Sequence, residues 1–234
     1  MSHSGSGRHI PYQPARIPIA EVHRRAATAL AELDTRRSVR MFDTAPVPRR
    51  IIEDLIRTAS TAPSGAHMQP WHFAAVSDPA LKARIRDAAE AEERKSYAHR
   101  MSDEWKAALA PLGTDAHKPH LTDAPWLVVL FAQTWGLNPD GSRCKHYYVS
   151  ESVGIAAGFF IAAVHRAGLC TLPHTPSPMG FLGDLLSRPR QERATLLLPV
   201  GFPAANCTVP EITRKPLIAV SSWFESPHDA KASE

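Results

Sequence analysis

Hydrophobic residues recur every three or four positions in the first half of the chain, which is the spacing of an amphipathic helix. Residues 19–34 and 48–62 both show this repeat. Residues 80–93 continue it, and the helical pattern extends to about Leu109. In the second segment, the apolar positions that share one face are Ile51, Ile52, Leu55, Ile56 and Ala59. The pattern therefore predicts helices that each bury one side.

Three short apolar segments are predicted strands: 71–78, 126–133 and 194–202. The last two are apolar enough to occupy a central position in a sheet. Between them, residues 147–167 are predicted to form a long helix. The apolar run within this helix, 153–164, is well short of the ~20 residues that a membrane span needs, so we expect a buried core helix.

The chain shows no internal repeat, no heptads and no linker, so we predict a single α+β domain over residues 10–225. Residues 1–9 and 226–234 are predicted to be flexible tails. Residues 214–224 carry apolar side chains with little intrinsic fold, which is typical of a segment that packs against a partner chain.

Composition is that of an ordinary globular protein, with 44% hydrophobic and 21% charged residues. The net charge of +4 is too small and too scattered to indicate nucleic acid binding, and it suits an anionic cofactor or substrate equally well. The three cysteines are far apart and lack CxxC spacing, so we expect neither a disulfide framework nor a metal site. With no signal peptide visible, a cytoplasmic location is expected.

Residues 36–42 are the first candidate binding segment. They contain three arginines and a serine, namely Arg36, Arg37, Ser38 and Arg40. Arginine presents a planar fork of donors, and two arginines can neutralise a phosphate dianion. A solvated basic patch between two helices explains the same residues equally well.

Three further segments carry candidate ligand contacts. Pro63, Ser64 and Gly65 form a predicted tight turn whose backbone amides could face a ligand. Thr175 lies in a proline-bounded loop, and Arg214 is a possible further phosphate contact. Each segment also has a simpler interpretation when it is taken alone. The turn is then a plain connection, Thr175 lies in an ordinary polar loop, and Arg214 is a surface arginine.

Glu93 and Tyr97 lie four residues apart in the charged segment 92–105. On a helix they therefore project side by side. A carboxylate and a phenol on one helix face can bind a ligand, but a solvated helix face is the simpler interpretation of the segment alone.

Taken in order, these motifs closely resemble the nitroreductase superfamily of FMN-dependent homodimers. The similarity runs from about His9 to Pro216 and includes "RRSVR", "TAPSGAH", "HYY", "LLLPVG" and "RKPL". It implies an α+β nitroreductase-like fold, in which helices flank a central mixed sheet and two chains intertwine with FMN at their interface.

The resemblance implies a role for each candidate cofactor contact. Arg36, Arg37, Ser38 and Arg214 are expected to hold the phosphate and ribityl end of FMN, and Arg40 the edge of the isoalloxazine ring. Ser64 and Gly65 are expected to line the flavin from the partner subunit. Thr175 is expected to hydrogen-bond flavin N5, which favours one-electron steps. Pro173 and His174 precede it, where the resemblance leads us to expect threonines.

Within the superfamily, the chain is most similar to the subgroup that dehalogenates halotyrosines. This implies an active-site lid over about 90–120, in which Glu93 pairs with the substrate ammonium while Tyr97 and Lys118 bind its carboxylate. The Ala66 amide is expected to bind the phenolate. The implied reaction is reductive dehalogenation of 3-iodo-L-tyrosine and 3,5-diiodo-L-tyrosine.

Other activities remain open at this stage. The chain has no GxGxxG motif after a strand, so electrons are expected from outside, either from NAD(P)H or from a separate reductase. The main alternative is an NAD(P)H-dependent nitroreductase or quinone reductase. A flavin-cleaving enzyme and a non-catalytic binder of halotyrosines or FMN are further alternatives.

Overall fold

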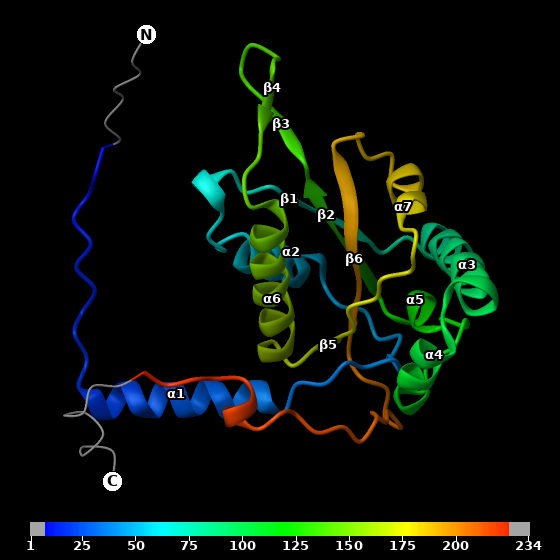
Figure 1. Ribbon diagram of the computed structural model, residues 1–234, viewed down its shortest axis with the longest axis horizontal. Coiled ribbons are helices and arrows are strands. Elements are labelled where there is room, and N and C mark those ends of the chain that lie inside the picture. The colour runs from blue at the N-terminus through cyan, green and yellow to red at the C-terminus, as the bar shows by residue number, and fades with distance from the viewer. Residues whose placement is uncertain (1–7, 225–234) are drawn as a thin grey trace.

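The computed structural model describes residues 8–224 (Figure 1). The predicted tails therefore lie almost entirely outside the described residues. The elements in chain order are the helices and strands α1 (Ile19–Asp34), α2 (Arg49–Ala59), β1 (Trp71–Val76), α3 (Pro79–Lys95), α4 (Asp103–Leu109), α5 (His120–Asp123), β2 (Trp126–Gln133), β3 (Trp135–Leu137), β4 (Arg143–Lys145), α6 (Val149–Arg166), β5 (Cys170–Thr171), α7 (Gly180–Leu185) and β6 (Glu192–Gly201).

A four-stranded sheet in the order β1-β2-β6-β5 forms the centre of the domain. Each neighbouring pair is antiparallel. A short parallel bridge between Ser38 and Thr171 adds a further segment beside β5. The sheet is thus largely antiparallel, and this bridge makes it mixed. It also places the arginine-rich segment 36–42 against the sheet.

Helices cover both faces of the sheet (Figure 1). On one face, Leu55 of α2 and Phe160 of α6 pack on Val128. On the other, Ile85 of α3 and Leu182 of α7 pack on residues of β2 that include Leu127 and Val129. Successive residues of β2 point to opposite faces, so both faces of this apolar strand are buried, which is why it is apolar throughout.

The predicted helix over 80–109 is interrupted. Asp78 caps the start of α3 by accepting a hydrogen bond from the Leu81 amide at 2.8 Å. A π-helical turn, Ser96–Arg100, extends α3, and Met101 then adopts an extended backbone that ends it. Ser102 begins α4 by capping the Trp105 amide. Together with the loop to α5, these turns make up the segment that is predicted to be a lid, and we call this segment the lid.

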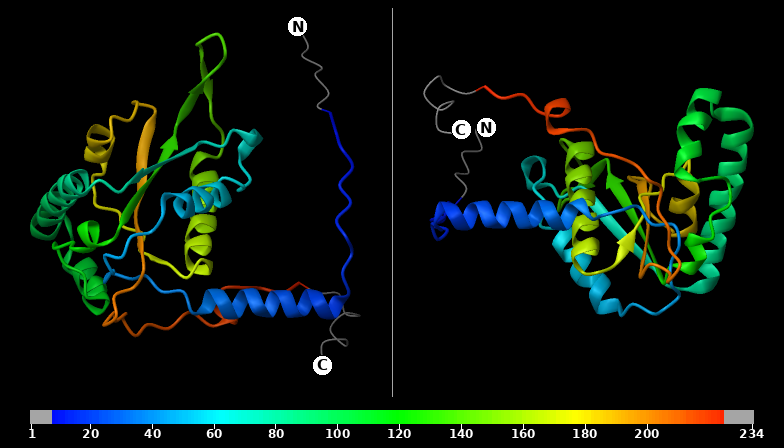
Figure 2. Two further views of the ribbon diagram at one scale, coloured as in Figure 1. Left: turned by 180° about the vertical axis from the view of Figure 1, so that it is seen from behind. Right: turned by 90° about the horizontal axis from the view of Figure 1, so that it is seen from below.

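Helix α1 projects from the body of the domain, and none of its residues is buried (Figure 2). The described C-terminal segment projects on the same side. Both segments expose large apolar side chains, among them Ile19, Leu30, Ile218, Trp223 and Phe224. Much apolar surface is therefore left without a partner in a single chain.

Candidate active site

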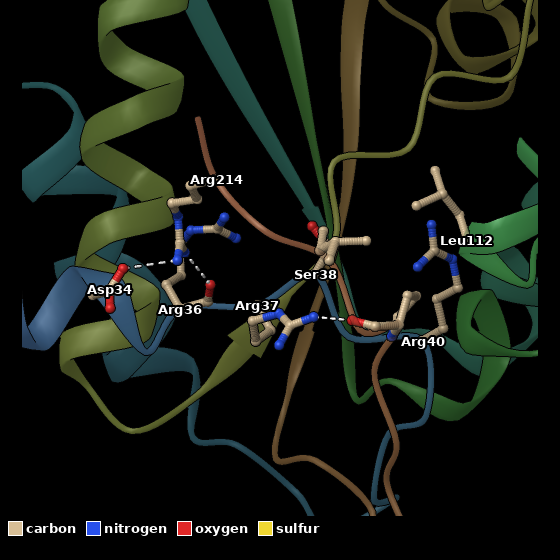
Figure 3. A pocket seen from close by; sticks show the side chains of 9 residues that line it. Asp34, Arg36, Arg37, Ser38, Arg40, Leu112 and Arg214 are labelled. Atoms are coloured by element: carbon tan, nitrogen blue, oxygen red, sulfur yellow. Dashed lines mark hydrogen bonds and ion pairs between the residues drawn. The ribbon is translucent and has the colours of Figure 1, made fainter. Parts of the chain in front are cut away.

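A cationic cavity of about 370 Å³ lies where the segment after α1 meets the C-terminal segment (Figure 3). We call it the arginine cavity. Its lining consists of Asp34, Arg36, Arg37, Ser38, Arg40, Leu112, Pro210, Ile212 and Arg214. The predicted phosphate contacts, which are far apart in sequence, thus line one hollow.

Two of these arginines are held by oxygen atoms of the chain. The Arg214 guanidinium donates to Asp34 Oδ1 at 2.8 Å and to the Arg36 carbonyl at 3.1 Å. Arg37 donates to the Pro210 carbonyl. Within residues 8–224, the side chains of Arg36 and Arg40 form no hydrogen bond or ion pair. The cavity therefore combines two fixed guanidinium groups with two that are available to an anion.

A second cavity of about 230 Å³ lies under the lid, and we call it the lid cavity. Charged and polar residues at its wall are Arg40, Glu93, Tyr97, Thr114, Lys118, His120, His174 and Thr175. The apolar lid residues Met101, Trp105 and Leu109 contribute to the same wall. Because Arg40 lines both cavities, the two are neighbours.

The lid cavity brings Glu93, Tyr97 and Lys118 together. Glu93 Oε2 lies 3.8 Å from Lys118 Nζ, which is ion-pair distance but too long for a hydrogen bond. Lys118 Nζ instead donates to Thr114 Oγ1 at 3.1 Å and to the Asp115 carbonyl. The Tyr97 hydroxyl donates to the Thr114 carbonyl at 3.0 Å. Oxygen atoms of Thr114 and Asp115 thus accept hydrogen bonds from Lys118 and Tyr97. A ligand carboxylate could accept the same hydrogen bonds in their place.

Burial controls the ionisation of these groups. It lowers the pKa of Lys118, and the attraction of Glu93 offsets this only in part. Burial also raises the pKa of Tyr97, and Glu93 raises it further. The pKa of His120 falls to about 3, first through burial and then through the neighbouring His174. His120 is therefore neutral at physiological pH, and Tyr97 keeps its hydroxyl proton.

The loop that contains Thr175 is fixed to the sheet. His174 and Leu197 of β6 exchange two backbone hydrogen bonds, each of 2.9 Å. Thr175 follows directly, is exposed and lines the lid cavity. Its hydroxyl forms no hydrogen bond to any described residue, so it is available to a ligand.

Ser64 and Gly65 of the predicted turn, and Ala66 directly after it, line neither cavity of the same chain. The turn lies near the start of α6, where a Cβ on Gly65 would come within 2.6 Å of the Tyr147 carbonyl. Ala66 has a left-handed backbone with φ of 49°, and its amide has no acceptor among the described residues.

Sequence reasoning overlooked several residues that the structure places at these sites. His120 and His174 both line the lid cavity, and Asp34 and Leu112 line the arginine cavity. The only sequence signal for the histidines is their position, since His120 follows Lys118 by two residues and His174 directly precedes Thr175.

Comparison with known proteins places the chain in a family. The nitroreductase family profile matches residues 33–202. The chain is 53% identical over 211 residues to the iodotyrosine deiodinase of Haliscomenobacter hydrossis, covering 90% of this chain and 95% of that protein. It is 43% identical over 210 residues to human iodotyrosine deiodinase 1, covering 89% and 73%. The chain therefore belongs to the nitroreductase family, and within it to the iodotyrosine deiodinases.

A solved structure supports the same placement. The crystal structure of oxidized iodotyrosine deiodinase bound to FMN and 3-iodo-L-tyrosine matches this chain with a TM-score of 0.73 at 28% identity. The match covers 84% of this chain and all of the other. The predicted nitroreductase-like fold is thus confirmed.

Proposed function

We propose that this protein uses FMN to remove halogen reductively from halotyrosines, converting 3-iodo-L-tyrosine and 3,5-diiodo-L-tyrosine to tyrosine and iodide. In this reaction the carbon–iodine bond breaks and iodide leaves with the bonding electron pair. The ring carbon takes up a proton and a new electron pair. Reduced FMN, when bound, would supply the two electrons that balance the reaction.

The arginine cavity suits the phosphate end of FMN. A phosphate needs several charge-assisted donors, and Arg36, Arg37 and Arg214 converge there. Asp34 already fixes Arg214, so the guanidinium is oriented before a ligand arrives. Arg40, which lines both cavities, is expected to contact the isoalloxazine edge. Ser38 adds a hydroxyl to the same wall.

The observation that carries the substrate assignment is the grouping of Glu93, Tyr97 and Lys118 in the lid cavity. A carboxylate can bind an ammonium, while an ammonium and a phenol can bind a carboxylate. These are the two ionic ends of a free amino acid. An enzyme that reduces uncharged nitroaromatics gains nothing from such a clamp. Closure of the lid would exclude water and strengthen each contact.

Two groups are assigned to the aromatic end of the substrate and to the flavin. The unpartnered Ala66 amide is proposed to bind the phenolate and stabilise its negative charge. Thr175 is proposed to donate its hydroxyl to flavin N5 and so to favour one-electron steps. Both groups lack hydrogen-bond partners within the described chain.

The functional unit is proposed to be a homodimer with FMN at the interface. Helix α1 has no buried residue, and Phe159 of α6 is 41% exposed, so a second chain would cover apolar surface. The partner would also supply Ser64, Gly65 and Ala66, which lie away from both cavities of their own chain. A single chain thus holds only part of the proposed site.

An external electron donor is proposed, either NAD(P)H or a separate reductase. We also propose a cytoplasmic location, which the free state of Cys144, Cys170 and Cys207 supports because a reducing compartment keeps thiols unpaired. Among residues 8–224, no helix has the length and apolar character of a membrane span. No nucleic acid partner is proposed.

The test is reoxidation of the flavin in anaerobically reduced, FMN-loaded protein. Mixing with 3-iodo-L-tyrosine should oxidise the flavin rapidly, whereas 2-iodophenol, which lacks the amino acid group, should react slowly. Equal rates with both compounds would overturn the substrate assignment. A preference for nitroaromatics with NADPH would instead favour the nitroreductase alternative.

A further inference from the structure

We propose that His174 is a positioning residue that holds the Glu93 carboxylate in the orientation that receives the substrate ammonium. This inference rests on the proposed function, since it assigns a residue to the same clamp. It concerns a contact between the lid and the sheet that joins residues 81 positions apart.

The contact is a buried hydrogen bond. His174 Nε2 lies 3.1 Å from Glu93 Oε1, and the two residues are 8% and 9% exposed. Lys118 Nζ lies 3.8 Å from the other carboxylate oxygen and bonds elsewhere. His174 is therefore the sole hydrogen-bond donor to the Glu93 side chain among the described residues.

The chemistry of the pair sets the direction of the bond. An ionised carboxylate only accepts hydrogen bonds, so His174 Nε2 carries the proton. The other ring nitrogen, Nδ1, is buried and has no partner in the described chain. A proton on Nε2 and none on Nδ1 fits both observations, because an Nδ1 without a hydrogen leaves no buried donor unpaired.

The backbone of His174 makes the ring a fixed reference point. Its amide and carbonyl both bond to Leu197 of β6, at 2.9 Å each. The His120 ring also packs against it in a T-shaped arrangement, with ring centroids 5.4 Å apart. Glu93 lies near the end of α3, three residues before the π-helical turn begins at Ser96. The hydrogen bond therefore ties the start of the lid to a rigid strand.

The same geometry connects the proposed substrate clamp to the loop that contains Thr175. His174 directly precedes Thr175, which lines the same cavity. A carboxylate held by His174 thus keeps a fixed position relative to the Thr175 hydroxyl. A carboxylate buried without its donor is poorly stabilised and takes up other rotamers or a proton. Loss of the imidazole should therefore weaken binding of the ammonium group specifically.

The test compares variants of the FMN-loaded protein at neutral pH. His174→Ala removes the donor, whereas His174→Gln keeps an amide N–H close to the position of Nε2. His117→Gln is the matched control. His117 also lies close to a glutamate of α3, at 3.3 Å from Glu90, but its side chain is largely exposed. Binding of 3-iodo-L-tyrosine and of 2-iodophenol is measured by the change in flavin fluorescence.

We expect His174→Ala to raise the dissociation constant of 3-iodo-L-tyrosine about tenfold or more, with 2-iodophenol binding unchanged. His174→Gln should restore most of the affinity, and His117→Gln should bind like the parent protein. Equal weakening for both ligands, or no rescue by glutamine, would show a merely structural role and overturn the proposal.

Failure of the proposed function looks different. In that case the parent protein would not discriminate 3-iodo-L-tyrosine from 2-iodophenol, and Glu93→Gln would have no effect. If the parent protein and Glu93→Gln behave as the clamp requires while His174→Ala binds normally, only the role of His174 is wrong.

Discussion

Replacement of Glu93 by glutamine is the sharpest perturbation of the proposed substrate clamp. Glutamine keeps the size of the side chain, and its carbonyl oxygen can still accept the hydrogen bond from His174 at this buried site. The change therefore removes one negative charge with little effect on packing. Glu93 is only 9% exposed, so water screens its attraction for an ammonium weakly.

The expected loss follows from the nature of the contact. A hydrogen bond to a charged group contributes about 1.5–3 kcal/mol, and about 1.4 kcal/mol corresponds to tenfold in affinity. Glu93→Gln should thus raise the dissociation constant of 3-iodo-L-tyrosine roughly 10- to 150-fold. Binding of FMN should not change, because Glu93 does not line the arginine cavity.

Flavin fluorescence titrations of the FMN-loaded protein measure this effect. The control variant is Glu92→Gln, since Glu92 is also on the lid but pairs with Lys95 and Arg100 outside the cavity. It should bind 3-iodo-L-tyrosine as the parent protein does. An unchanged affinity in Glu93→Gln, or equal losses for 3-iodo-L-tyrosine and 2-iodophenol, would refute the clamp.

Three other predictions concern the cofactor and the buried histidine. Arg214→Ala should weaken FMN binding by at least about tenfold in an equilibrium titration of the apoprotein; undiminished affinity would remove Arg214 from the phosphate site. Thr175→Ala should still bind FMN, but anaerobic reduction, monitored by flavin absorbance, should no longer show separate one-electron steps. If the absorbance changes match those of the parent protein, the proposed contact with N5 is wrong. Folding lowers the pKa of His120 from 6.5 to about 3. Below pH 6.5 the unfolded chain therefore binds a proton that the folded chain does not, and the free energy of unfolding should fall by up to about 1.4 kcal/mol per pH unit. His120→Leu should reduce this slope in urea unfolding, and an unaltered slope would show that His120 is not buried in its neutral form.

The elements with a strong local signal were predicted well. The apolar segment 126–133 is strand β2 to the residue, because a strand buried on both faces is apolar throughout. The helix predicted over 147–167 begins later, at Val149, because Tyr148 adopts a left-handed backbone. The lid helix is broken at Met101, where the local sequence contains neither glycine nor proline to signal a break.

The candidate site was only partly predictable for a similar reason. The spacing of Glu93 and Tyr97 pointed to one side of a helix, and both line one cavity although a π-helical turn begins between them. The contact of Glu93 with His174 joins two distant segments through tertiary packing, which no local pattern encodes. The role of Ala66 needs a second chain, so it remains a proposal.

The most direct test of the central claim is product analysis. FMN-loaded protein is reduced anaerobically and mixed with excess 3-iodo-L-tyrosine, and iodide and tyrosine are then quantified. If the protein is a reductive deiodinase, one iodide and one tyrosine should form for each reduced flavin that is oxidised. Oxidation of the flavin without iodide release, or no reaction with 3-iodo-L-tyrosine at all, would contradict this function.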